Sequence, residues 1–229
     1  NSALKSAPGC YSDIIRNPKT ATALIKSVRR HATERGLHDD PPEFYDIYYG
    51  GHGIQIGTDV YLVPSDADIS DQRDVPRECV SLSDIFLVLR DYLDDPVYNK
   101  LKKTIHFIIH LDSCRLSMDQ RNVQVALACE PERPKCPRKW TVFFSCSRTQ
   151  PASNGPSGGH SPFTQAFLDP QYGFMAEGIT LASAMSNVDN ALLLLTQNQC
   201  MIQSGRALPE PFCTRPKAVT EPLSQAPAS

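Results

Sequence analysis

The sequence has no hydrophobic run long enough to cross a membrane. Its longest apolar runs, such as residues 191–195, are far shorter than the roughly 20 residues that a membrane span needs. It also lacks an excess of charge of one sign, because the net charge is only −2. We therefore expect neither a membrane nor a nucleic acid as a partner.

Closely spaced cysteine pairs are absent as well. No Cys-x-x-Cys pair occurs, so the spacing is not that of a zinc site. A chain of 229 residues can bury its own hydrophobic core and does not depend on disulfides for stability. We expect most of the cysteines to be reduced and buried, and the protein to be cytoplasmic. The eight cysteines are Cys10, Cys79, Cys114, Cys129, Cys136, Cys146, Cys200 and Cys213.

No shift in composition marks a second folded domain. With 41% hydrophobic and 21% charged residues, the chain is typical of a globular protein, and we expect one domain over residues 1–205. Prolines recur in residues 206–229 with little apolar content, which predicts a disordered tail. Because the chain begins with Asn1 and not with Met, we expect it to be a piece of a longer protein.

Apolar segments with strand character alternate with segments of helical periodicity. Asn17 and Pro18 predict the start of a helix, and Gly36 predicts its end. Further helices are expected after residues that can cap them: Ser81 or Ser83, Ser161, and Thr180. The expected strands are residues 44–49, 60–63, 105–111 and 141–146. This alternation predicts an α/β fold, a three-layer sandwich with a mainly parallel sheet flanked by helices.

Two short motifs directly follow two of these strands. Residues 48–53 are Tyr-Tyr-Gly-Gly-His-Gly, and residues 111–115 are Leu-Asp-Ser-Cys-Arg. If both strands lie in one parallel sheet, His52 and Cys114 emerge at the same carboxyl edge, where ligands bind in such sheets. A cysteine nucleophile with a histidine partner has this layout.

A cysteine peptidase needs a thiolate, an imidazole and backbone N–H donors for the oxyanion. Glycines beside His52 allow the backbone to approach a substrate closely, and we nominate the N–H groups of Gly53 and Cys114 as the donors. Taken alone, Cys114 is more simply interpreted as a buried structural thiol, and His52 as a turn residue. The two motifs together favour the catalytic interpretation.

Together, the motifs resemble those of the caspase-like cysteine peptidases, in particular the metacaspase and paracaspase branch. Residues 61–64, 143–147 and 161–168 add to the resemblance, which extends from about residue 17 to about residue 200. It implies a caspase-like fold whose first core strand would precede residue 1. It also implies that Cys114 is the nucleophile and His52 the general acid and base, a dyad that requires no third residue.

The resemblance places Asp112 and Gly50 in the S1 pocket, which holds the substrate residue before the scissile bond. A carboxylate there would pair with a guanidinium or ammonium group and repel an aspartate, so we expect cleavage after Arg or Lys. The alternative for Asp112 is a carboxylate that caps a loop. Two other pocket acids of relatives correspond to Ser2 and Gln150, so basic selectivity would depend on Asp112. Arg115 after the cysteine is nearer the paracaspase pattern.

Three other features each allow two interpretations. His106 and His110 lie on the same face of one strand. They are either a metal-binding pair or part of a packed core, and we favour the packed core. The acidic loop over residues 66–74 suits calcium, which some metacaspases need, but we favour a solvated loop. The basic run over residues 133–139 is either an autoprocessing site or a solvated linker. We expect no cofactor and no resident metal.

We therefore expect a cysteine endopeptidase that cleaves protein or peptide substrates after Arg or Lys. The alternative is a catalytically silent caspase-like scaffold or interaction domain, in which Cys114 would react with iodoacetamide no faster than the other cysteines. A weaker third interpretation is another Cys–His hydrolase or transferase, which would transfer acyl groups without cleaving peptides. Paracaspase relatives also suggest a homodimer formed through an edge strand.

Overall fold

The computed structural model describes residues 18–36, 44–57, 59–95, 105–113, 116–117, 137–147, 152–153, 155, 159–197 and 199–205. The chain divides into two compact units. The first comprises Asn1–Ser153 with Asn198–Ala207, and the second comprises Asn154–Gln197 with Leu208–Ser229. The predicted tail over residues 206–229 lies outside the described residues. None of the described helices is both long and apolar enough to cross a membrane.

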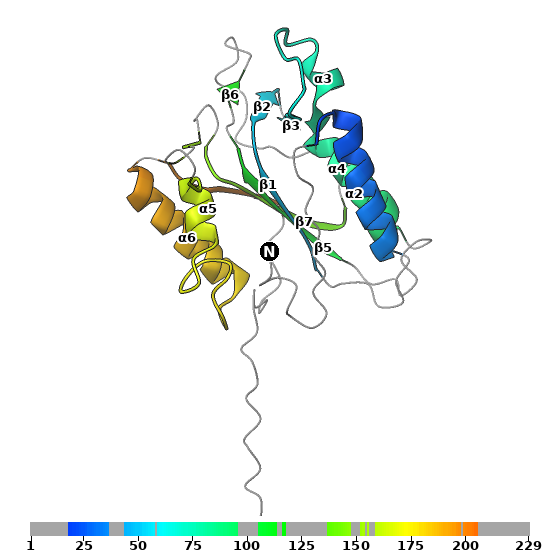
Figure 1. Cartoon of the computed structure of the whole chain (residues 1–229). Coiled ribbons are helices and arrows are strands. Elements are labelled where there is room, and N and C mark those ends of the chain that lie inside the picture. The colour runs from blue at the N-terminus through cyan, green and yellow to red at the C-terminus, as the bar shows by residue number, and fades with distance from the viewer. Residues whose placement is uncertain are drawn as a thin grey trace, which may run out of the picture. The chain divides into compact units, whose positions relative to one another are not determined.

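The first unit is built on a four-stranded sheet with the strand order β1-β5-β7-β8 (Figure 1). β1 (Phe44–Gly50), β5 (His106–Asp112) and β7 (Lys139–Phe144) run parallel, and β8 (Ile202–Gly205) pairs antiparallel with β7. Every residue of β5 is buried, as is typical of a central strand in a parallel sheet. The predicted mainly parallel sheet is therefore confirmed.

Two helices cover one face of this sheet, α2 (Ala21–Gly36) and α4 (Leu82–Leu89) (Figure 1). Alternate residues of β5 point to this face because side chains alternate along a strand. On this face the ring centroid of Phe86 in α4 lies 5.1 Å from that of Trp140 in β7. The buried core between helices and sheet includes Leu24, Val28, Ala32, Ile85, Phe86, Leu89, Phe107, Ile109, Leu111, Val142 and Phe144.

Capping residues determine where these helices begin. Ser81 precedes α4, and its hydroxyl oxygen accepts the N–H of Asp84 at 3.0 Å, as the sequence predicts. The predicted start of α2 is wrong, because Pro18 lies before the helix. Instead the Thr20 hydroxyl accepts the N–H of Ala23 at 3.2 Å, and this cap places the first turn further along the chain. At its other end α4 continues as a π-helix, η1 (Arg90–Asp94).

A second, smaller sheet in this unit has the strand order β4-β3-β2-β6. β2 (Gly53–Ile56) begins directly after His52, and β3 (Asp59–Leu62) pairs antiparallel with it. The predicted strand over residues 60–63 is therefore confirmed as β3, which ends at Leu62. β4 (Val80–Ser81) and β6 (Leu116–Ser117) complete this sheet, and the short α3 (Val75–Glu78) precedes β4.

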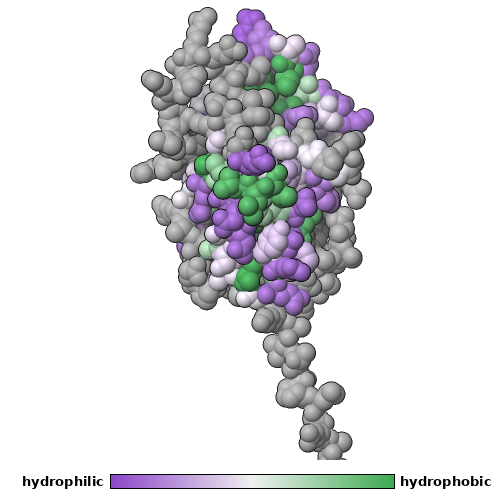
Figure 2. All heavy atoms as spheres, turned by 90° about the vertical axis from the view of Figure 1, so that its left-hand side faces the viewer, coloured by the Kyte–Doolittle hydropathy of each residue, from purple (hydrophilic) through white to green (hydrophobic). Residues whose placement is uncertain are grey.

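The second unit contains α5 (Pro162–Phe167) and α6 (Leu181–Thr196). Both helices begin as predicted, because the hydroxyls of Ser161 and Thr180 accept backbone N–H groups of the first turns. Rings of Phe163, Phe167 and Phe174 stack in sequence. Hydrophobic residues also gather on the surface that faces the viewer in Figure 2. The exposed leucines at the end of α6 are Leu193, Leu194 and Leu195.

The core of the first unit predicts a large cost for one truncation in α4. Leu89 is fully buried in the core, so Leu89→Ala should lower the free energy of unfolding by about 2–5 kcal/mol, measured by chemical denaturation. Leu194→Ala is the matched control, since Leu194 is 83% exposed, and should change this free energy by less than about 0.5 kcal/mol. Equal effects of the two substitutions would contradict the assigned core.

Candidate active site

The pairing of β1 with β5 brings the two sequence motifs to the same edge of the main sheet. Gly50 lies opposite Asp112 at the carboxyl ends of these parallel strands. One residue further on, the N–H of Gly51 donates to the carbonyl oxygen of Asp112 at 3.1 Å. His52 follows Gly51 directly. Cys114, the second residue after Asp112, lies outside the described residues, as does Arg115.

The backbone of His52 is held from two directions while its side chain is exposed. Its carbonyl oxygen accepts the N–H of Val63 at 3.0 Å. The hydroxyl of Tyr49 lies 2.9 Å from the same oxygen and 3.2 Å from the carbonyl oxygen of Val63. Burial raises the pKa of Tyr49 to about 12, although the hydrogen bond to Val63 acts in the opposite direction. Tyr49 is therefore a protonated donor at neutral pH.

The close approach of Tyr49 accounts for the glycine before His52. A Cβ atom added to Gly51 would lie 2.7 Å from the Tyr49 hydroxyl oxygen and 2.9 Å from its Cζ. At Gly50 the nearest atom to such a Cβ would be Cε1 of Tyr48, at 3.4 Å, which is an ordinary van der Waals contact. Gly51 is thus required to be glycine by the position of the Tyr49 ring. The local sequence pattern does not indicate this reason.

The direction of the Gly53 N–H follows from the pairing of β2 with β3. Gly53 lies opposite Leu62, and the His52 carbonyl before it points to β3, where it accepts the N–H of Val63. Successive residues of a strand point their backbone polar groups to alternate sides. The Gly53 N–H therefore points away from β3, to the side on which β6 pairs with β2.

Asp112 ends β5 and is a buried residue that is 8% exposed. The hydroxyl of Tyr48 donates to its Oδ2 atom at 3.0 Å. Tyr48 is 39% exposed, so this contact lies at the surface end of the strand. Tyr48 is not among the site residues that the sequence motifs predict. Its only signal was its place in β1, two residues before Gly50, which puts both residues on one face of the strand.

The segment after β7 supports Ser113 from the neighbouring strand. Ser145 donates its N–H to the carbonyl oxygen of Leu111 at 2.9 Å, and the Cys146 thiol donates to the carbonyl oxygen of Ser113 at 3.4 Å. The side-chain amide of Gln199 donates to the carbonyl oxygen of Ser145 at 2.7 Å. Cys146 is thus a buried structural thiol. Ser2 and Gln150, which the resemblance compares with pocket acids, lie outside the described residues.

The paired histidines of β5 are part of the packing between strands. His106 Nε2 lies 3.0 Å from Thr141 Oγ1, and His110 Nε2 lies 3.2 Å from Asp46 Oδ2. The ring of His110 also stacks on Phe143 with centroids 5.2 Å apart. Burial lowers the pKa of His106. Within the part of the chain that the structure describes, no three His, Cys, Asp or Glu residues form a group suited to a metal ion.

The carboxylates of the acidic loop have local hydrogen-bond donors. Asp68 Oδ1 accepts the N–H of Ser70, and Asp71 accepts both the N–H and the guanidinium of Arg73. These donors lower the pKa of Asp68 and Asp71. Asp68 is exposed and Asp71 is partly exposed to water, so this arrangement resembles a solvated loop.

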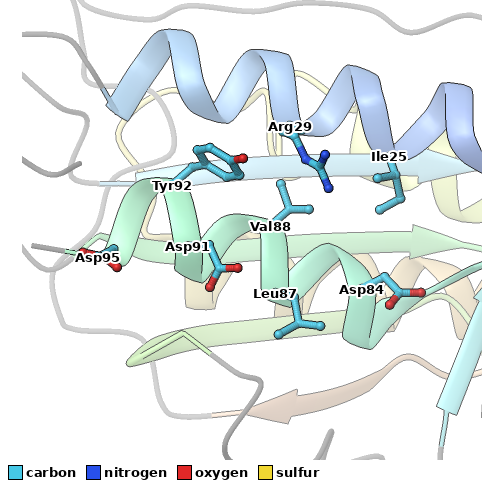
Figure 3. Close-up of a pocket in the computed structure, with 8 residues that line it drawn as sticks. All are labelled: Ile25, Arg29, Asp84, Leu87, Val88, Asp91, Tyr92 and Asp95. Carbon is cyan, nitrogen blue, oxygen red and sulfur yellow. The ribbon is translucent and has the colours of Figure 1, made fainter. Parts of the chain in front are cut away.

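A hollow of about 550 Å³ lies between α2 and the α4–η1 segment (Figure 3). Ile25 and Arg29 reach it from α2, while the remaining lining residues come from α4, η1 and the position after it. None of the predicted site residues lines it, so it is not part of the candidate active site. The remaining lining residues are Asp84, Leu87, Val88, Asp91, Tyr92 and Asp95.

Comparisons with known proteins agree with this architecture. The family model of the caspase domain matches residues 2–217. The structure is also similar to the crystal structure of caspase-1 from Spodoptera frugiperda, with a TM-score of 0.54 and 14% sequence identity. The similarity covers 89% of this chain and 73% of that chain, and it shows the caspase-like fold. No curated protein is similar enough in sequence to count as a match.

The packing around Tyr49 predicts different costs for two adjacent glycine substitutions. Gly51→Ala forces the hydrogen-bonded phenol of Tyr49 to move, and should lower the free energy of unfolding by about 1–3 kcal/mol. Gly50→Ala creates only an ordinary contact with Tyr48. It should change the free energy of unfolding by less than about 0.5 kcal/mol. Urea denaturation of both variants measures the difference. The packing argument fails if the two substitutions have the same cost.

Proposed function

Because the chain belongs to the caspase domain family of cysteine hydrolases, we propose that it is an endopeptidase with a Cys114–His52 dyad. In this proposal Cys114 is the nucleophile and His52 is the general acid and base. The substrates are proteins or peptides with Arg or Lys before the scissile bond. The motifs favour the metacaspase and paracaspase branch of the family.

One hydrogen bond is the main support for the dyad. The Gly51 N–H to Asp112 carbonyl contact of 3.1 Å joins the residue before His52 to the second residue before Cys114. Consecutive Cα atoms are about 3.8 Å apart, so His52 and Ser113, each one residue from this contact, lie close to it, and Cys114 follows Ser113 in the sequence. The exposed side chain of His52 is accessible to a substrate.

The proposed reaction uses backbone and side-chain groups of this edge. His52 accepts the Cys114 proton, and the thiolate attacks the scissile carbonyl carbon. The Gly53 N–H, which points away from β3, and the Cys114 N–H donate to the resulting oxyanion. Protonated His52 then gives its proton to the leaving amine as the acyl-enzyme forms, and water hydrolyses the thioester to free the thiol. No metal or cofactor is needed for these steps.

Asp112 is the proposed basis of selectivity. Its carboxylate lies at the carboxyl end of β5, opposite Gly50, which has no side chain to cover it. A nearly buried carboxylate binds a guanidinium or ammonium group through charge-assisted hydrogen bonds and repels an acidic side chain. We therefore propose that Asp112 and Gly50 belong to the S1 pocket.

Substitution of the dyad provides the first test. Fluorogenic peptides ending in Arg, Lys or Asp are incubated with the full chain, with and without calcium. Wild type should cleave after Arg or Lys, and Cys114→Ala and His52→Ala should reduce kcat/KM by about 10³-fold or more.

Cys200→Ala is the matched control for this test, because Cys200 is a partly exposed free cysteine; it should keep full activity. Cleavage after Asp would contradict the proposed selectivity for Arg or Lys but would agree with the proposed peptidase activity. A folded wild-type chain that cleaves none of the peptides under any condition would favour the alternative, a catalytically silent scaffold.

A charge substitution tests the S1 assignment separately. Asp112→Asn should lower kcat/KM for an arginine substrate by about 10²-fold, because a charge-assisted pair is lost. Cleavage of the matched citrulline peptide, which has no charge, should change little. Asp66→Asn in the exposed loop is the control and should leave both activities unchanged. A similar loss for arginine and citrulline peptides would mean that Asp112 serves the fold and not selectivity.

A further inference from the structure

The geometry around Asp112 points to one further residue of the site. We propose that Tyr48 determines selectivity by holding the Asp112 carboxylate with its hydroxyl and presenting its ring to the guanidinium of an arginine substrate. This inference depends on the proposed function, because it concerns the same S1 pocket. It predicts that the enzyme prefers Arg to Lys.

The strand register explains why these two side chains meet. In the β1–β5 pair Tyr48 lies opposite His110, and Gly50 lies opposite Asp112. Tyr48 and Asp112 are therefore diagonal neighbours on one face of the sheet, within reach of a long aromatic side chain. The glycine directly opposite Asp112 has no side chain, and the Tyr48 hydroxyl reaches Asp112 Oδ2 at 3.0 Å.

The neutral hydroxyl of Tyr48 is a suitable hydrogen-bond donor to the Asp112 carboxylate, because the negative charge of this carboxylate is needed to bind a basic substrate. Asp112 is only 8% exposed, and an ionised group this deeply buried needs hydrogen-bond donors to offset the loss of water. A lysine or arginine of the chain in this place would neutralise the charge that a basic substrate needs. The Tyr48 hydroxyl donates to the carboxylate without itself cancelling the negative charge.

The ring of Tyr48 adds a second recognition element. Its Cε1 atom lies 3.4 Å from where a Cβ atom of Gly50 would be, so the ring lies directly beside this glycine. The side chain is nevertheless 39% exposed. An accessible aromatic ring next to a carboxylate is suited to a planar guanidinium, which stacks on rings more readily than an ammonium group does.

Two substitutions at Tyr48 separate the hydroxyl from the ring. Tyr48→Phe keeps the ring and should lower kcat/KM by about fivefold to tenfold for arginine and lysine peptides alike, with little change for the citrulline peptide. Tyr48→Leu also removes the ring and should lower kcat/KM for arginine by a further factor of about three to ten. The ratio of arginine to lysine cleavage should then approach one.

Tyr172→Phe is the matched control, since Tyr172 also has an aspartate neighbour, Asp169, but lies in the second unit. It should leave the three activities and the arginine-to-lysine ratio unchanged. A loss in Tyr48→Phe that is equal for arginine and citrulline peptides would show a structural role and overturn the proposal. An unchanged arginine-to-lysine ratio in Tyr48→Leu would overturn the role of the ring.

A binding measurement distinguishes this inference from the proposed function. Each Tyr48 variant is also made with Cys114→Ala, and calorimetry measures the Kd of the uncleaved arginine peptide. Weaker binding in Tyr48→Leu supports the inference even if the wild-type chain cleaves no peptide. The inference is overturned if the Tyr48 substitutions do not weaken binding. It is also overturned if the Cys114→Ala parent does not bind the arginine peptide.

Discussion

The parallel pairing of β1 with β5 is the interaction on which the rest of this structure depends. It extends from Phe44 opposite His106 to Gly50 opposite Asp112, and the Gly51 N–H to Asp112 carbonyl bond continues it. A shift of one residue in this register would turn every side chain of β5 to the other face. Asp112 would then point into the apolar core beneath α2 and α4, and the core residues of β5 would lose their cover. Packing of the core therefore specifies the position of the candidate site.

The two faces of β5 have different uses. One face packs Phe107, Ile109 and Leu111 against the helices, and the energy of apolar burial stabilises the sheet. The other face carries His106, His110 and Asp112, each with a polar contact to a neighbouring strand. A buried polar group costs free energy unless it is hydrogen-bonded, so these contacts make the polar face compatible with burial. The same arrangement leaves the Asp112 carboxylate held at the end of the strand.

Two tyrosines of β1, Tyr48 and Tyr49, organise the candidate site, although neither is proposed to react. Tyr49 points to the helical face and anchors the His52 backbone through its hydroxyl, while Tyr48 points to the opposite face and holds Asp112. Adjacent residues of one strand thus serve the proposed catalytic and specificity groups separately. This follows from the alternation of side chains along a strand. Gly51, which follows them, leaves room for the Tyr49 ring.

The sequence by itself determined the alternation of strands and helices, the caps at Ser81, Ser161 and Thr180, and the placement of both motifs at strand ends. These features depend on periodicity and on hydrogen bonds between residues close in the chain. Only the tertiary structure decided the contact of Tyr48 with Asp112 and that of Tyr49 with Val63, which fixes the ring for which position 51 must be glycine. Asp112 and Tyr48, for example, are 64 residues apart in the chain. Contacts over such separations arise from strand register and side-chain packing, and no local pattern in the sequence encodes them.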